Sequence, residues 1–238
     1  MDALPLYFKV NISFFYVSHT NRWKGKMEKR SQHGTTGGAL EFVPLTPERW
    51  TAFESLFGER GACGGCWCMW WRLRNAEYQR AKGEGNRRAM RKLVNGGVVP
   101  GILALSNGEP VGWCALAPRE EYPRLSGSRV LKPLDERRVW SIVCFFVKKA
   151  ARRQGVSERL IRAAVEHAER DGATCIEAYP IDPSNSKQAD VFVFSGLLSA
   201  FIKSGFKEVA RRSPTRPIVR YTVHESESRK VREGRRNR

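Results

Sequence analysis

The chain has 238 residues, of which 41% are hydrophobic and 11% aromatic, as in a globular protein with one buried core. It has no run of about 18 apolar residues, so no membrane-spanning helix is predicted. The formal net charge of +18 favours phosphate-bearing partners such as nucleic acid, an acidic membrane surface or a cofactor, although a general bias toward arginine would produce the same charge.

The first 39 residues lack the pattern of a folded element. Five basic residues between Arg22 and Arg30 precede a stretch rich in serine, threonine and glycine, which is typical of a flexible tail. We expect this appendage to be disordered, or to be an extension upstream of a start at Met27. A second basic tail is predicted at 224–238, which leaves 40–223 as one folded domain.

The folded part is predicted to begin with a strand at Glu41–Leu45 and a helix after it. Thr46 can cap that helix, and Pro47 suits its first position. A second helical region, rich in arginine and lysine, is expected from Ala76 to Leu93.

The next elements are predicted strands. Gly101–Leu105 and Pro110–Ala117 flank Asn107-Gly108, a pair typical of a two-residue hairpin turn. After a polar loop at 118–133, Val139–Val147 is apolar almost throughout, as expected for a strand covered on both faces.

The remaining elements alternate between helix and strand. Apolar residues from Val156 to Ala168 recur at helical spacing, and Gly172 ends that helix; His167 is expected to be exposed on it. The later expectations are a strand at 175–179, a helix at 191–203, and strands at 206–210 and 218–223. The order predicts a single α/β domain.

The link between the apolar strand and the amphipathic helix is basic and contains Gly155. Free backbone N–H groups and the positive end of the helix dipole form an anion site at Val156 and Ser157, and Gly155 lets a phosphate approach the backbone. Further positive charge comes from Lys148, Lys149, Arg152 and Arg153. The ligand predicted here carries a pyrophosphate.

This link resembles the motif of the GNAT superfamily of acetyl-CoA-dependent N-acetyltransferases. The family pattern, Arg/Gln-x-x-Gly-x-Gly/Ala after a central strand, corresponds here to Arg152, Arg153, Gln154, Gly155, Val156 and Ser157. Ser157 departs from the usual last residue but is small. The resemblance extends from about Glu41 to Val223 and includes Ser204-Gly205-Phe206 after the late helix.

The resemblance implies acetyl transfer from acetyl-CoA to a primary amine by direct attack in a ternary complex. The turn would hold the CoA pyrophosphate, and the backbone of Phe145, Phe146 and Val147 would hold the pantetheine arm on a strand that parts from its neighbour. The amine acceptor, a small molecule or a protein, stays open, as does the oligomeric state.

The usual acid and base of the family are missing. Where many relatives carry a tyrosine, an asparagine and a glutamate, this chain has Phe201, Phe194 and Val143. Glu177 and Tyr179 on the next strand are the nearest candidates, although packing or an ion pair would explain both. Cys144 has no local base and is expected to be a small buried side chain.

The segment from Gly61 to Arg74 contains Cys63, Cys66 and Cys68 among three tryptophans. A structural zinc site needs four ligands, usually in two pairs, and a thioredoxin-like setting is absent, so neither a metal nor a redox pair is the preferred interpretation. By its place in the resembling fold, the segment is predicted to form the acceptor wall, with substrate-binding residues Trp70, Trp71, Arg72 and Trp113.

Two further expectations complete the prediction. Six cysteines without an export signal favour a reducing cytoplasm and no membrane association. The alternative function is that of a basic nucleic-acid-binding protein whose CoA-binding fold is inactive or secondary. Such a protein would bind RNA or DNA with a steep salt dependence.

Overall fold

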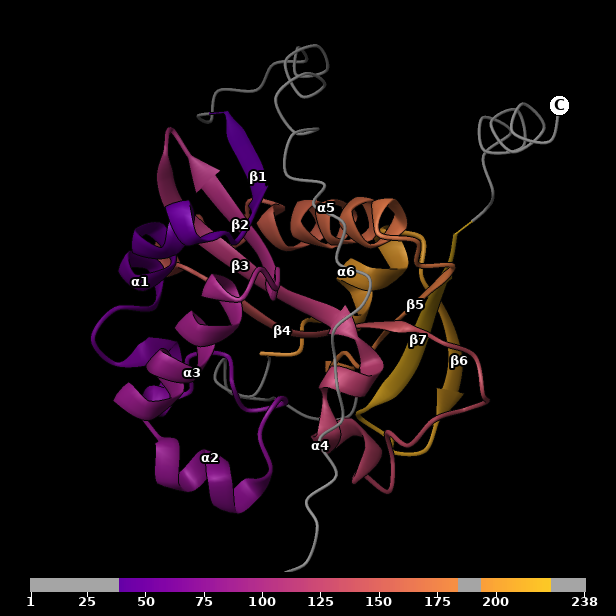
Figure 1. Cartoon of the computed structure of the whole chain (residues 1–238). Coiled ribbons are helices and arrows are strands. Elements are labelled where there is room, and N and C mark those ends of the chain that lie inside the picture. The colour runs from indigo at the N-terminus through magenta and orange to yellow at the C-terminus, as the bar shows by residue number, and fades with distance from the viewer. Residues whose placement is uncertain (1–38, 184–193, 224–238) are drawn as a thin grey trace, which may run out of the picture. The chain divides into compact units, whose positions relative to one another are not determined.

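The computed structural model describes residues 39–183 and 194–223, which form one seven-stranded sheet with helices on both faces (Figure 1). The predicted tail at 224–238 and nearly all of the predicted appendage lie outside these residues. The strands are β1 (Leu40–Pro44), β2 (Gly101–Ser106), β3 (Glu109–Pro118), β4 (Trp140–Val147), β5 (Cys175–Ala178), β6 (Lys207–Arg211) and β7 (Pro217–Thr222). The helices are α1 (Trp50–Phe57), α2 (Asn75–Ala81), α3 (Glu84–Asn95), α4 (Pro123–Ser126), α5 (Val156–Arg170) and α6 (Leu198–Lys203).

The strand order is β1-β2-β3-β4-β5-β7-β6, and every neighbouring pair is antiparallel except β4 and β5. That parallel pair joins only three residues of each strand, Trp140–Ile142 to Ile176–Ala178. Among the described residues, β4 continues to Val147 without a β5 partner, so the two strands part halfway along β4. The predicted fold class, a mixed and mostly antiparallel sheet flanked by helices, is confirmed.

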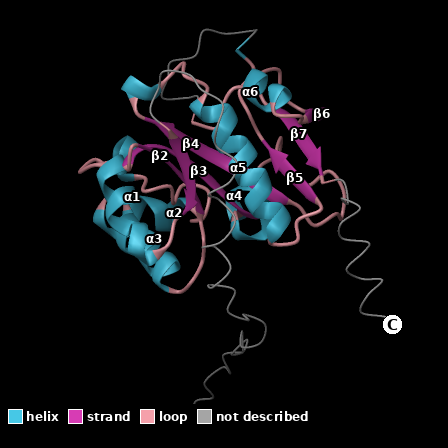
Figure 2. Ribbon diagram, turned by 90° about the horizontal axis from the view of Figure 1, so that it is seen from above, coloured by secondary structure: helices cyan, strands magenta, loops and turns pink. Residues whose placement is uncertain are grey.

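Alternating side chains of the central strands supply two separate cores. Leu103 and Trp113 face the core under α1 and α3, whereas Ile102 and Cys114 face the core under α5 and α6. Figure 2 shows α1, α2 and α3 gathered at one end of the molecule, and α6 with β5, β6 and β7 at the other. The sheet is therefore covered on both faces, as the apolar sequence of β4 predicts.

The hairpin between β2 and β3 forms at the predicted dipeptide. Asn107 and Gly108 both adopt positive φ, 51° and 82°, which a two-residue turn of this twist requires. Among the described helices, none has both the length and the apolar character needed to cross a membrane.

The helical region expected at 76–93 is two helices, because the chain breaks at Lys82 and Gly83. Gly83 has a φ of 82°, and its N–H donates to the carbonyl of Gly65 at 3.0 Å. Asn86 donates to the same oxygen at 2.9 Å. The break thus fixes the start of α3 against the cysteine-rich segment.

The helix expected at 191–203 begins only at Leu198 in the described residues, and 191–193 lie outside them. Residues 194–197 are not helical, because they lie along Ile181: Ile181 N–H donates to Gly196 at 2.8 Å and Leu198 N–H donates to Ile181 at 2.9 Å. The polar loop at 118–133 also contains the short helix α4.

His167 is buried and not exposed as expected, with 4% of its surface accessible. Its ring lies edge-on to Trp140, with centroids 6.1 Å apart. Because the neighbours of His167 in the sequence are charged, the sequence predicted an exposed residue. The contact with Trp140 arises only when α5 packs on the sheet.

Candidate active site

The chain between β4 and α5 winds tightly into a left-handed turn. Lys149–Ala151 forms a single 3-10 turn, and Arg153 and Gly155 then adopt positive φ, 62° and 71°. Apart from its chain neighbours, no heavy atom lies within 4 Å of the place that a Cβ on Gly155 would take. The backbone is therefore open to an approaching ligand at the residue that precedes α5.

The turn concentrates positive charge at a helix N-terminus. The 15-residue helix α5 begins at Val156, and its first N–H groups have no carbonyl partner within the helix. Arg152, Arg153 and Gln154 are exposed around them, while buried Val156 anchors the helix on the sheet and Ser157 is half-buried in its first turn. The side chain of Gln154 donates to the carbonyl of Ala150 at 2.9 Å and so stabilises the turn. This geometry suits a phosphate or pyrophosphate.

The edge of β4 that parts from β5 already carries hydrogen bonds. Phe145 N–H donates to the carbonyl of Phe194 at 2.5 Å, and the Nε of Arg152 donates to the carbonyl of Val147 at 3.2 Å. Phe145 and Phe146 point to opposite faces, toward Phe201 at 5.8 Å and Phe57 at 5.7 Å between ring centroids. A ligand that pairs with the Phe145 amide must therefore replace Phe194.

The cysteine-rich segment has a strained backbone. Three non-glycine residues in it, Ala62, Trp67 and Cys68, have φ values of 66°, 45° and 59°. Such conformations cost about 1–3 kcal/mol each and persist only where surrounding contacts hold them. One such contact stacks Trp67 on Phe57 of α1, with ring centroids 5.8 Å apart.

Of the predicted substrate residues, Trp113 lies deepest. It is fully buried, and its indole N–H donates to the Sγ of Cys68 at 3.1 Å. Trp113 therefore supports the cysteine-rich segment from inside the core. Phe53 lies against it, with ring centroids 4.9 Å apart.

Trp70, Trp71 and Arg72 leave the segment in different directions. Trp70 is half-buried under Arg124, whose guanidinium lies 3.7 Å from the ring centroid. Trp71 is 7% exposed and lies 6.4 Å from the ring of Phe194. The Arg72 side chain, 5% exposed, pairs with Glu121.

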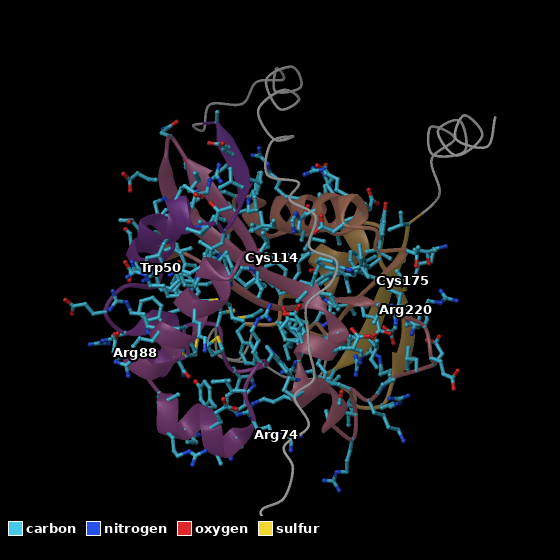
Figure 3. All side chains as sticks on the ribbon, in the orientation of Figure 1. Trp50, Arg74, Arg88, Cys114, Cys175 and Arg220 are labelled. Atoms are coloured by element: carbon cyan, nitrogen blue, oxygen red, sulfur yellow. The ribbon has the colours of Figure 1, made fainter. Side chains whose placement is uncertain are left out.

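All six cysteines are free thiols. Cys68 and Cys144 are hydrogen-bonded, which lowers the pKa of the Cys68 thiol; the Trp113 N–H and the charge of Arg72 act in the same direction, and burial opposes them. Burial raises the pKa of Cys66 to about 11. Cys175 lies on β5, apart from Cys114 on β3 (Figure 3). Within the described residues, no three His, Cys, Asp or Glu side chains are placed to hold a metal ion.

The two acid–base candidates belong to a buried polar network. Glu177 is 1% exposed and accepts hydrogen bonds from Arg119 at 3.2 Å, from Tyr179 at 2.8 Å and from Arg220 at 2.8 Å. The Tyr179 hydroxyl also meets Ser141 of β4 at 3.0 Å. Burial, with the charge of Glu177 next, raises the pKa of Tyr179 well above its ordinary value.

Sequence reasoning missed Tyr122 and Arg216, which adjoin these groups, and it named Phe194 only as the residue in place of the family's asparagine. Arg216 donates to the Tyr179 carbonyl at 3.3 Å and to Ser195 at 3.2 Å, and lies over the Phe194 ring. Tyr122 lies under the guanidinium of Arg72. No local motif marks Tyr122 or Arg216, since each reaches the site from a loop that only the fold brings there.

Comparison with known proteins identifies a family. Residues 67–193, more than half of the chain, match the family described as the Acetyltransferase (GNAT) family. None of the curated proteins matches the chain.

Solved structures resemble the chain at low identity. A PaiA N-acetyltransferase from Thermoplasma acidophilum, in complex with coenzyme A, is 12% identical over 78% of this chain and 99% of its own, with a TM-score of 0.45. An N-acetyltransferase from Staphylococcus aureus Mu50 is 13% identical over 77% and 98%, with a TM-score of 0.46. The NatC complex bound to Gag peptide and CoA gives 12% over 78% and 99%, with a TM-score of 0.46.

Likenesses this weak assign no residue role, so the family rests on the matched sequence, which includes the Arg152–Ser157 motif. The chain belongs to the GNAT acetyltransferase family, and the predicted enzyme class, an acyltransferase, is confirmed.

Proposed function

We propose that this acetyltransferase moves an acetyl group from acetyl-CoA to a primary amine, by direct attack of the amine on the thioester in a ternary complex. The observation that carries the proposal is the basic left-handed turn at Arg153 and Gly155, at the end of the strand that parts from β5.

The turn is assigned the pyrophosphate of CoA. The backbone amides at Gly155, Val156 and Ser157 meet the phosphate oxygens, and Arg152 and Arg153 supply charge around them. The open space above Gly155 supports this, because a phosphate must reach the backbone without meeting a side chain.

The part of β4 that no longer pairs with β5 is assigned the pantetheine arm, through Phe145, Phe146 and Val147. Because the Phe145 N–H donates to Phe194, the arm and the Phe194 carbonyl compete for the same donor. Binding of acetyl-CoA therefore requires Phe194 to leave this edge.

The acceptor is assigned to the face of β4 that carries Cys144 and Phe146. Trp70, Trp71 and Arg72 form its wall, and Trp113 supports the wall through Cys68. Packing of Phe146 on Phe57 and of Trp67 on the same ring joins the wall to the cofactor strand.

The attacking amine must lose a proton, and the leaving thiolate must gain one. Glu177 and Tyr179 stay the candidates for these roles. Their contacts with Arg119 and Ser141 favour a positioning role for Glu177, which holds the Tyr179 hydroxyl toward β4. The free state of all six thiols supports the proposed cytoplasmic location.

The test is acetyl transfer itself. Purified protein is mixed with acetyl-CoA and a panel of primary amines, and released CoA thiol and product mass are followed together. We expect thiol release that depends on the amine, with one acetyl group gained by the amine. An acetyl group found on the protein before amine is added would contradict direct attack, and the absence of acetylated amine across the panel would contradict the activity.

A further inference from the structure

Two residues of the acceptor wall, and a tyrosine in contact with one of them, carry buried polar atoms without a partner. Within the part of the chain that the structure describes, the indole N–H of Trp71, one terminal nitrogen of Arg72 and the hydroxyl of Tyr122 make no hydrogen bond. Single unpaired atoms of this kind occur elsewhere, on Trp50 and Asn86 for example, but here two consecutive residues and a residue in contact with the second carry them.

These side chains come together from two segments. Trp71 and Arg72 are consecutive, and the guanidinium carbon of Arg72 lies 5.0 Å from the ring centroid of Tyr122. Tyr122 follows the turn that carries Glu121, so Arg72 and Tyr122 are fixed together from both sides. Arg72 and Tyr122 are therefore in contact, and with Trp71, which precedes Arg72 in the chain, they are here called the donor cluster.

The donor cluster adjoins the part of β4 assigned to acetyl-CoA. Cys68 lies in the same core as Cys144, the residue before Phe145, and the charge of Arg72 helps to lower the pKa of the Cys68 thiol. On its other side, Trp71 packs against Phe194, whose carbonyl holds the Phe145 amide. Departure of Phe194 would thus open the cluster and the cofactor edge together.

Each free atom of the cluster can donate a hydrogen bond, and the guanidinium nitrogen and the indole N–H can only donate. Burying a guanidinium nitrogen, an indole N–H and a hydroxyl without acceptors is unfavourable, so an acceptor that reaches them is bound favourably. Glu121 engages only the other terminal nitrogen of Arg72, and its own side chain is 38% exposed at the rim. A planar carboxylate with two acceptor oxygens is the complement of a guanidinium beside a hydroxyl.

We propose that the donor cluster binds a carboxylate of the acceptor, so that the substrate class is amines that also carry a carboxylate, such as amino acids. This inference rests on the proposed function. Arg72 supplies the charged hydrogen bond, and Tyr122 and Trp71 supply the neutral ones.

Matched acceptors test the proposal: glycine, glutamate and lysine are compared with the same compounds in which the carboxylate is a primary amide. With acetyl-CoA present, we expect kcat/KM to be at least about 30-fold higher for the carboxylates, the order of effect for one lost partner of a buried charged pair. Arg72→Gln should remove this preference by raising KM for carboxylates only. Arg74→Gln, an exposed arginine two residues away, is the matched control and should keep it.

Tyr122→Phe separates a ligand-binding role from a structural one. Removing an unpaired buried hydroxyl should leave the melting temperature unchanged or raise it, while KM for the carboxylate acceptors rises several-fold. A fall in melting temperature with unchanged KM would mean that the hydroxyl is paired inside the protein, and would overturn the assignment.

The proposal and the proposed function fail in different ways. Equal rates for carboxylates and amides, or transfer only to amines without a carboxylate, overturn the donor cluster and leave the acetyltransferase intact. If no amine reacts, the melting temperature with CoA decides: no stabilisation by any of the carboxylates overturns the inference, whereas lack of stabilisation by CoA itself contradicts the proposed function.

Discussion

Glu177 is a carboxylate almost entirely removed from water and held by two arginines. One of its oxygens accepts from Arg119 at 3.2 Å and the other from Arg220 at 2.8 Å, and Arg220 also binds Asp135 with both terminal nitrogens. The charge of Glu177 is therefore compensated inside the protein by Arg119 and Arg220. The network therefore fixes β5 and β7 to the loop between β3 and β4.

Removing this charge should destabilise the fold. Glu177→Gln leaves Arg119 without its buried partner, and we expect the free energy of unfolding to fall by about 3–5 kcal/mol. Glu208→Gln, which breaks the surface pair with Arg211, is the control and should cost about 0–1 kcal/mol. Urea unfolding of the three proteins measures both, and equal losses would mean that the Glu177 network is no stronger than a surface pair.

Features that depend only on neighbouring residues could be predicted from the sequence. The turn at Arg152–Ser157 needs a glycine and basic residues at fixed spacing, and that requirement is visible in the chain. The packing of Trp113 and His167 is not visible, because burial depends on partners more than 20 residues away. The indole N–H of Trp113 finds its acceptor only when Cys68 folds over β3.

Helix α5 contains a pH-sensitive contact at His167. Burial lowers the pKa of its imidazole below the ordinary 6.5, although Asp171 opposes the shift. The unfolded chain therefore binds this proton more readily, and the free energy of unfolding should fall as the pH drops below about 6.5. Denaturant titrations between about pH 7.5 and pH 5 should show the loss, and His167→Gln should reduce it. A variant with the same pH dependence would mean that other groups cause it.

The segment beginning at Phe194 should regulate access of acetyl-CoA to β4. A Cβ at Gly196 would lie 3.0 Å from the Phe201 ring and 3.2 Å from the Phe145 ring, so Gly196→Ala should loosen the segment. If the segment competes with pantetheine, the CoA affinity should rise, by about 3–10-fold, because a larger fraction of the protein is ready to bind.

Gly172→Ala is the control for this experiment, since Gly172 also has a positive φ, 90°, but has open space around it. Calorimetric titration with CoA compares the two variants. Equal affinities, or a weaker Gly196→Ala complex, would contradict competition between the segment and the cofactor.

Element boundaries could be predicted where the sequence itself contains the residues that a turn or a helix start requires. The hairpin at Asn107-Gly108 and the start of α5 after Gly155 are of this kind. The break between α2 and α3 was missed because Gly83 is stabilised in its turn by a hydrogen bond to distant Gly65. The late start of α6 likewise depends on the pairing of Gly196 with Ile181.

Across the whole molecule, the net charge of +18 fits two explanations. The proposed enzyme uses part of that charge at the turn before α5, whereas a nucleic-acid-binding protein would use it over the surface. Composition alone does not distinguish the two explanations, because it does not say where the charges lie on the folded protein. In the structure, four basic residues precede the N-terminus of α5 in the same turn: Lys148, Lys149, Arg152 and Arg153.

Binding of CoA at the turn before α5 tests the proposed cofactor site directly. Gly155→Glu places a negative, bulky side chain where the pyrophosphate is assigned, and Gly172→Glu places the same side chain at the far end of α5, at a glycine of similar φ and similar open surroundings. At a CoA concentration about 100 times Kd, we expect the melting temperatures of the natural protein and of Gly172→Glu to rise by about 5–10 °C. The melting temperature of Gly155→Glu should not respond to CoA. Equal stabilisation of the two glutamate variants would contradict the assignment of this turn to the cofactor.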